Sequence, residues 1–264
     1  EAVDEPTRTM LAEWCAENHL DAVVSTDGDA DRPMLTDETG AIVPGDVLGV
    51  LTARMLAAEA VVTPVSSNSM VSDGLFDRVI LTRIGSPFVI AGMEALGTES
   101  PHIRVVGFEA NGGFLLGFTA QGPVGPLPAL ATRDAMLPIL APLAATRREN
   151  RSLSALRAML PPRFTAADRL QNVSSVQARD FLVQLRSDAA ERAAFCRGWG
   201  EIVDINETDG LRLTFDTADI VHLRPSGNAP EFRVYTEANT SARARTLAAT
   251  ATERVAAELG QNSK

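Results

Sequence analysis

The stretch Thr26-Asp27-Gly28-Asp29-Ala30-Asp31-Arg32 places three carboxylates at alternate positions and an arginine directly after them. A helical pattern over residues 6–18 and an apolar run at 22–24 come before it, which predicts a loop at the end of a strand over 21–25. Open α/β sheets bind their ligands at the carboxyl ends of strands. Three carboxylates this close repel one another unless a cation lies among them, so Asp27, Asp29 and Asp31 predict a divalent metal site, with Mg²⁺ as the expected ion.

Two other interpretations of this stretch stay open. Asp27, Asp29, Asp31 and Glu38 stand at the acidic positions of a calcium-binding EF-hand loop, but Arg32 takes the place of the glycine that the sharp turn needs. A plain acidic surface turn without a ligand is the other alternative. Arg32 argues against both, because a cation beside a metal cluster is useful where an anion such as a phosphate is also bound.

Composition limits the partners of the chain. Its 264 residues, 45% of them hydrophobic, suffice for two domains, and a net charge of −10 disfavours nucleic acid and anionic membranes as partners. Lys264 is the only lysine among 24 basic residues, so a bound phosphate would meet guanidinium groups or backbone amides. Two distant cysteines, no signal peptide and no long apolar run predict a cytoplasmic enzyme.

Residues 44–150 read as an α/β domain. Helices are expected over 45–58 and 68–77, strands over 60–65, 78–82 and 103–107, and a helix over 131–145 interrupted at Pro138 and Pro142. This alternation predicts a mainly parallel sheet covered by helices. Arg83, in the turn after the second strand, either faces a ligand or is an ordinary surface residue.

The loop Phe108-Glu109-Ala110-Asn111-Gly112-Gly113-Phe114 is a candidate sugar site. Glu109 and Asn111 are two residues apart, so in an extended loop they point to the same side, and both accept hydrogen bonds from hydroxyl groups. A glycine-rich hairpin with no ligand is the alternative.

The polar run 147–151 marks a predicted domain boundary, and residues 151–264 read as an α+β domain with an antiparallel sheet. Expected are a helix ending before Pro161, a helix over 175–195, strands over 201–206, 211–215, 220–224 and 232–237, and a helix over 240–259. The loop between the last two strands combines backbone amides with forked donors, as a phosphate site requires, although a simple turn would share part of this composition. Its candidate ligands are Arg224, Ser226, Gly227, Asn228 and Arg233.

These loops, in this order, resemble those of the α-D-phosphohexomutases, which include phosphomannomutases, phosphoglucomutases and phosphoglucosamine mutases. Residues 27–32 match the family's metal loop Asp-Gly-Asp-Gly/Ala-Asp-Arg, and 82–85 resemble its Thr-Lys-Val-Gly turn. Residues 108–113 resemble the sugar loop Gly-Glu-x-Ser-Gly-His, with Asn111 in the serine position and no histidine. Residues 224–233 resemble the phosphate loop Arg-Pro-Ser-Gly-Thr-Glu-Pro-x-x-Arg, with Asn228 for threonine and Ala229 for glutamate.

The resemblance implies an enzyme that interconverts hexose 1-phosphate and hexose 6-phosphate through a phosphoserine and a bisphosphate intermediate. It assigns Mg²⁺ to Asp27, Asp29 and Asp31, catalytic roles to Arg32 and Arg83, and sugar contacts to Glu109 and Asn111. Residues 1–43 would then close a truncated α/β domain, 44–150 would form the sugar domain and 151–264 the phosphate domain.

The family's nucleophile stands in a Ser-His-Asn-Pro setting that this sequence lacks. The resemblance therefore implies a missing amino-terminal phosphoserine domain, and the chain alone is expected to be inactive. Phosphomannomutase is the first expectation for the substrate and phosphoglucomutase the second. Phosphoglucosamine mutase, or a non-catalytic module that binds sugar phosphate or metal, is the alternative.

Overall fold

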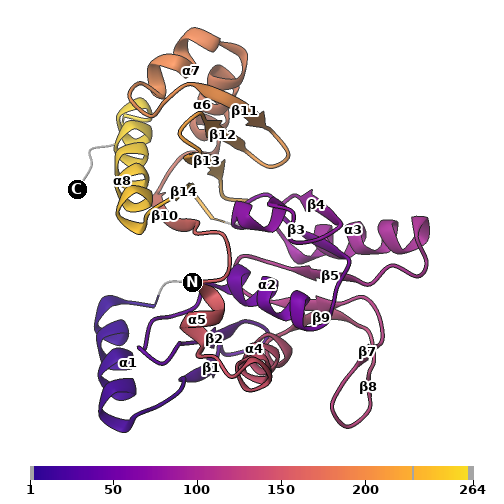
Figure 1. Cartoon of the computed structure of the whole chain (residues 1–264). Coiled ribbons are helices and arrows are strands. Elements are labelled where there is room, and N and C mark those ends of the chain that lie inside the picture. Colours follow the sequence, from indigo (N-terminus) through magenta and orange to yellow (C-terminus); the bar gives the residue numbers. More distant parts are fainter. Residues whose placement is uncertain (1–2, 228, 261–264) are drawn as a thin grey trace. The chain divides into compact units, whose positions relative to one another are not determined.

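The computed structural model describes residues 3–227 and 229–260. The chain forms two compact units, Glu1–Pro161 and Pro162–Lys264, which are described separately (Figure 1). The division falls after the predicted boundary at 150/151. Leu153 and Leu156 of helix α5 (Leu153–Arg157), together with Leu160, are buried in the core of the first unit, which explains why the unit extends this far.

The first unit is built on a five-stranded mixed sheet of order β4-β3-β5-β6-β9. Strand β3 runs parallel to β4 and β5, whereas the pairs β5–β6 and β6–β9 are antiparallel. Its elements are α1 (Glu5–Asn18), β1 (Val24–Thr26), β2 (Pro33–Leu35), α2 (Gly45–Met55), β3 (Ala60–Pro64), a 3₁₀ turn (Ser69–Ser72), β4 (Arg78–Thr82), α3 (Ser86–Glu99), β5 (Val105–Phe108), β6 (Phe114–Leu116), β7 (Ala120–Gln121), β8 (Pro126–Leu127), β9 (Leu130–Asp134), α4 (Met136–Glu149) and α5.

Helices cover both faces of this sheet. Val61 and Val106 point into a core that includes α2 and α4, while Val62 and Val105 point into a second core formed with α3. Successive side chains of a strand alternate between faces, so a sheet buried on both sides needs apolar residues at every position. The predicted α/β sandwich is thus confirmed. Because β3, β4 and β5 are parallel, the loops that follow them lie at the same end of the sheet, next to the carboxyl ends of these strands.

The predicted metal loop lies in a hairpin. Strands β1 and β2 pair antiparallel, with Val24 opposite Leu35 and Thr26 opposite Pro33, and residues 27–32 form the connection. Leu35 is buried in the same core as α2. The loop is therefore anchored to the sandwich through β2.

The second unit is an antiparallel sheet of order β10-β14-β13-β12-β11 covered by helices, which confirms the predicted α+β domain. Leu211, Leu213 and Phe215 alternate along β12 and belong to a buried core that includes residues of the helices. The elements are β10 (Phe164–Gln171), α6 (Ser175–Ser187), α7 (Ala189–Phe195), β11 (Ile202–Asn206), β12 (Leu211–Phe215), β13 (Ile220–Pro225), β14 (Glu231–Ala238) and α8 (Ser241–Glu258).

Several predicted elements were wrong. Residues 130–134 form strand β9 instead of the start of a helix, and α4 runs through Pro138 and Pro142 without interruption. The helix expected over 68–77 is only a 3₁₀ turn, and β10 was not predicted. The helix expected over 175–195 is divided at Asp188, whose side chain accepts hydrogen bonds from the first amides of α7. Among the described residues no helix has the length and apolar character needed to cross a membrane.

Candidate active site

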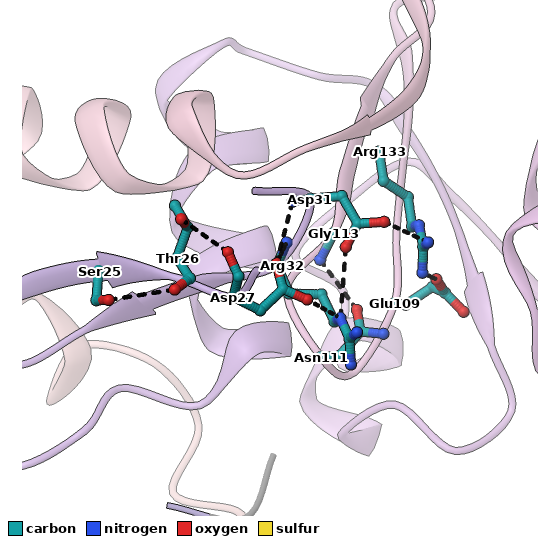
Figure 2. A network of polar contacts seen from close by, with 9 residues as sticks. All are labelled: Ser25, Thr26, Asp27, Asp31, Arg32, Glu109, Asn111, Gly113 and Arg133. Carbon is teal, nitrogen blue, oxygen red and sulfur yellow. Dashed lines mark hydrogen bonds and ion pairs between the residues drawn. The ribbon is translucent and has the colours of Figure 1, made fainter. Parts of the chain in front are cut away.

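The metal loop is closed by Asp27. Its Oδ1 accepts hydrogen bonds from the backbone N–H groups of Asp31 and Arg32, each at 3.2 Å, and its Oδ2 lies 2.5 Å from Arg32 Nε (Figure 2). Burial opposes ionisation of Asp27, but the hydrogen bonds and the charge of Arg32 outweigh it and lower the pKa of this carboxyl. The loop therefore presents an ionised carboxylate at neutral pH.

Arg133 of strand β9 joins the metal loop to the sugar loop. Its Nη2 contacts Asp31 Oδ2, and its Nη1 lies 3.5 Å from Glu109 Oε2 (Figure 2). Glu109 is 7% exposed, and its Oε2 has no hydrogen bond within the described part of the chain. We call this arrangement the Asp31–Arg133–Glu109 bridge. It brings together two of the predicted site residues through a third that was not predicted.

The sugar loop is held by its own hydrogen bonds. The Glu109 N–H donates to the Gly113 carbonyl at 3.1 Å, the Gly112 N–H donates to the Glu109 carbonyl at 2.9 Å, and the Gly113 N–H donates to Asn111 Oδ1 at 3.0 Å. Gly112 has φ +91°, and a Cβ there would meet Pro33, the first residue of β2 directly after the metal loop, at 2.7 Å. The two loops therefore pack directly on each other.

A polar network supports the sugar loop from behind. Thr63 Oγ1 donates to the Phe108 carbonyl at 2.8 Å and lies 2.7 Å from Ser67 Oγ. Asp46, buried at the start of α2, accepts a hydrogen bond from the Asn68 N–H at 2.9 Å. These contacts tie the loop after β3 to the last residue of β5, directly before Glu109.

The three aspartates suit a hard divalent cation by their chemistry, because carboxylate oxygens are its preferred ligands. Asp27 Oδ2 is buried and pairs with the Arg32 guanidinium, so this oxygen already faces a positive charge. Asp29, however, is exposed, and no group of three acidic, histidine or cysteine side chains in the described ranges has an arrangement that holds a metal. The donor set fits Mg²⁺, and the metal site itself stays a prediction.

Arg83 does not join the bridge. It is exposed in the turn between β4 and α3, and its guanidinium lies 4.8 Å from the centre of the Phe88 ring. Helix α3 begins at Ser86 directly after Gly85, which has φ +129°. The turn leading into a helix is as expected from the sequence, and the role of Arg83 stays a prediction.

In the second unit, three arginines form a row across adjacent strands. Arg224 on β13 is directly opposite Arg233 on β14, and Arg233 is directly opposite Arg169 on β10. Glu231 lies 3.0 Å from Arg169 Nη1 and 3.4 Å from Arg233 Nη2. Hydrogen bonding to Tyr235 and the nearby acidic charge raise the pKa of Arg233. The three positive charges of the row face two carboxylates, Glu231 and Asp209, so the row keeps a net positive charge at the base of the predicted phosphate loop.

The phosphate loop itself begins at the end of β13. The Ser226 N–H donates to the Glu231 carbonyl at 2.8 Å, and Gly227 is exposed. Asn228 lies outside the described residues. The structure thus places the two predicted arginines beside each other, with Ser226 two residues after Arg224.

Asp209 holds Arg224 from the neighbouring turn, with Oδ1 3.0 Å from Arg224 Nε. The turn rests on His222, whose Nε2 lies 2.6 Å from the Asp209 carbonyl oxygen, and on Arg186, whose Nη2 donates to the Gly210 carbonyl. His222 is 2% exposed, and burial lowers the pKa of its imidazole to about 4. The imidazole is therefore neutral at pH 7, and the turn is fixed beneath Arg224.

Comparison with known proteins gives the same assignment for both units. Residues 44–164 match a family model described as "Phosphoglucomutase/phosphomannomutase, alpha/beta/alpha domain III", and residues 167–254 match "Phosphoglucomutase/phosphomannomutase, C-terminal domain". The chain belongs to the phosphoglucomutase/phosphomannomutase family. This confirms the family expected from the metal, sugar and phosphate loops.

Individual members of the family agree. A phosphomannomutase from Salmonella muenchen is 42% identical over 264 residues, covering 99% of this chain and 54% of that protein. The crystal structure of a phosphoglucomutase/phosphomannomutase family protein from Burkholderia thailandensis has a TM-score of 0.69 at 19% identity, covering 97% of this chain and 51% of that one. The chain spans about half the length of the curated relatives it matches.

A more distant structure is the N-acetylphosphoglucosamine mutase of Aspergillus fumigatus, determined in complex with GlcNAc-6P and magnesium. It has a TM-score of 0.55 at 16% identity and covers 89% of this chain and 52% of that one. At this identity the likeness concerns the fold alone.

Sequence reasoning missed Arg133, Arg169 and Asp209. The sequence did carry one signal next to Arg133. Asp134 precedes an apolar run, which is typical of a helix start, and it accepts hydrogen bonds from the first two amides of α4. Asp209 had no such signal, because its ion pair with Arg224 depends on the pairing of β12 with β13.

Proposed function

We propose that the protein acts in a phosphohexomutase reaction of the phosphomannomutase or phosphoglucomutase type, the interconversion of a hexose 1-phosphate and a hexose 6-phosphate. The observation that carries the proposal is the row of Arg169, Arg233 and Arg224 beside the Ser226 loop. Like charges directly opposite one another destabilise a sheet. Glu231 and Asp209 offset part of this repulsion, and a dianionic phosphate that accepts bonds from the guanidinium forks would offset the rest. The 42% identity to a phosphomannomutase supports the same reaction type.

In this proposal the second unit anchors the phosphate that does not react. Arg224 and Arg233 supply paired N–H donors, while Ser226, Gly227 and Asn228 supply a hydroxyl and backbone amides. A phosphate group is recognised equally well on either end of a hexose, so one such anchor serves both orientations of the substrate.

In the first unit, Glu109 and Asn111 would hold the sugar hydroxyls, and Asp27, Asp29 and Asp31 would hold Mg²⁺. A bound divalent cation supplies positive charge beside the transferring phosphoryl group. Arg32 would donate hydrogen bonds to that group as its negative charge is redistributed, and Arg83 would act in the same way from the turn after β4.

The nucleophile of the proposed reaction is a phosphoserine that we place outside this sequence, which has no Ser-His-Asn-Pro segment. Turnover by the chain alone is therefore not expected. A reducing, cytoplasmic compartment is consistent with the two free cysteines, both of which are buried. Burial raises the pKa of Cys196 to about 12, so this thiol stays protonated.

Calorimetric titration tests the proposal. The chain is titrated with mannose 1-phosphate, glucose 1-phosphate and inorganic phosphate, beside Arg224→Gln and the control Arg78→Gln, which removes a surface ion pair with Glu99. We expect both sugar phosphates to bind more tightly than inorganic phosphate. Loss of charged hydrogen bonds in Arg224→Gln should weaken binding about tenfold or more, and Arg78→Gln should not. A folded chain that binds no sugar phosphate better than inorganic phosphate would refute the assignment and leave a module without this specificity.

A further inference from the structure

We propose that Arg133 couples the metal loop to the sugar loop, by competing with a cation for Asp31 while it orients Glu109 for hexose hydroxyls. The inference rests on the proposed function, since it concerns the same site. It assigns a positioning role to a residue of strand β9, which no motif of the sequence includes.

The position of Arg133 is fixed on two sides. Strand β9 pairs with β6, with Phe114 opposite Asp134, and Asp134 ends the strand by accepting hydrogen bonds from Met136 N at 2.9 Å and Leu137 N at 3.0 Å. The arginine stem then passes over Gly113, where a Cβ would lie 2.9 Å from Arg133 Cδ. The guanidinium therefore reaches the two loops from a rigid element.

Charge explains why a guanidinium is needed there. Glu109 is buried, and its Oε2 has no hydrogen bond among the described residues. Arg133 Nη1 lies 3.5 Å from this oxygen and supplies a positive charge beside it. A buried carboxylate is costly unless a positive group compensates it. The same guanidinium contacts Asp31 Oδ2 through Nη2, so one positive charge serves both carboxylates.

This sharing gives opposite effects at the two carboxylates. A divalent cation bound by Asp31 takes an oxygen that Arg133 now contacts, so the guanidinium weakens metal binding by competition. At Glu109 the guanidinium compensates the buried charge and fixes the carboxylate, which favours hydrogen bonds from sugar hydroxyls. Removing the charge should therefore strengthen metal binding and weaken sugar binding. A residue that merely stabilises the fold would weaken both when it is removed.

The experiment compares the chain with Arg133→Gln, Arg133→Lys and Arg104→Gln. Arg104 directly precedes β5, at the opposite end of this strand from Glu109, and pairs with Glu59. Its loss therefore removes one positive charge without touching either loop. Electron paramagnetic resonance of free Mn²⁺ gives the metal affinity, and calorimetry with mannose 1-phosphate gives the sugar affinity. Circular dichroism checks that each variant is folded.

For Arg133→Gln we expect Mn²⁺ to bind about five- to tenfold more tightly and mannose 1-phosphate about tenfold more weakly. Arg133→Lys keeps the charge but cannot bridge two carboxylates with a planar fork, so its Mn²⁺ affinity should stay near that of the parent chain while sugar binding weakens. Arg104→Gln should change neither.

Two results would overturn the inference alone: both affinities unchanged in the Arg133 variants, or both weakened together. If the parent chain binds mannose 1-phosphate no better than inorganic phosphate, the proposed function fails as well. If it binds the sugar phosphate but not Mn²⁺, the coupling fails and the sugar-phosphate assignment stands. Should Arg133→Gln not fold, Arg133→Lys decides between these outcomes.

Discussion

Gly45, the first residue of α2, has no side chain, and this allows the backbone of the sugar loop to pack closely against the start of the helix. The variant Gly45→Ala tests whether the loop depends on this close contact. A Cβ at this position would lie 2.7 Å from the Ala110 carbonyl oxygen and closer still to backbone atoms of Asn111 and Gly112. Ordinary contacts of a Cβ begin near 3.4 Å. All the atoms it would meet belong to the backbone, so relief requires the loop or the helix start to move.

The expected cost follows from this geometry. Overpacking a well-packed site costs about 1–3 kcal/mol. In a unit of this size a loss of 1 kcal/mol lowers the melting temperature by about 2–4 °C, so the first unit should melt roughly 3–10 °C lower. Because the displaced segment lies directly after Glu109, mannose 1-phosphate should also bind about tenfold more weakly.

Gly97→Ala is the matched control. Gly97 lies in α3, and a Cβ there would have nothing within 4 Å. Alanine in a helix interior gains up to about 1 kcal/mol over glycine, so this variant should melt at the parent temperature or slightly above it. Thermal unfolding and calorimetric titration are measured on both variants. A Gly45→Ala protein that melts and binds like the parent chain would show that the sugar loop does not depend on this close approach.

Two predictions concern the second unit. The pKa of buried His222 is lowered to about 4 from 6.5, so below pH 6.5 the unfolded chain takes up a proton that the folded chain does not. The free energy of unfolding should therefore fall by about 3 kcal/mol between pH 7 and pH 4. The His222→Phe variant should lose most of this pH dependence in urea unfolding. Asp209→Asn leaves the largely buried Arg224 guanidinium without its carboxylate, and the urea midpoint should correspond to a loss of about 3 kcal/mol. An unchanged midpoint would mean that the ion pair does not hold the turn.

Elements with a strong apolar pattern could be predicted from the sequence. Strands β4 and β12 have the predicted bounds, because their side chains face a core and local pattern and tertiary burial agree. Strand β9 was mistaken for helix, since its alanine and leucine residues favour helix locally while its pairing with β6 is a long-range property. Strand β10 was also missed because its pairing, here with β14, is a long-range property. In addition, most of its residues are exposed, so it has no clear apolar pattern.

In the candidate site, too, features carried by a continuous stretch of sequence could be predicted and contacts between distant segments could not. The predicted metal, sugar and phosphate loops are continuous stretches whose residue types and spacing indicate their chemistry, so the sequence alone was enough to propose them. The Asp31–Arg133–Glu109 bridge joins three segments far apart in the chain. No local pattern relates them, because their proximity follows from the order of strands in the sheet.

The unpredicted arginines have a common origin. Arg133 lies on β9 and Arg169 on β10, and both strands are at the edge of their sheets. An edge strand pairs on one side only and is tolerated with few apolar residues, which leaves β9 and β10 with a weak signature in the sequence, although the edge strands β4 and β11 were predicted. The same exposure allows it to carry charged side chains that reach loops beside the sheet. In β9 and β10, weak predictability and the capacity to supply compensating charge to a site therefore occur together. In a related chain, an arginine on an unpatterned segment that follows a ligand loop should be tested for such a contact.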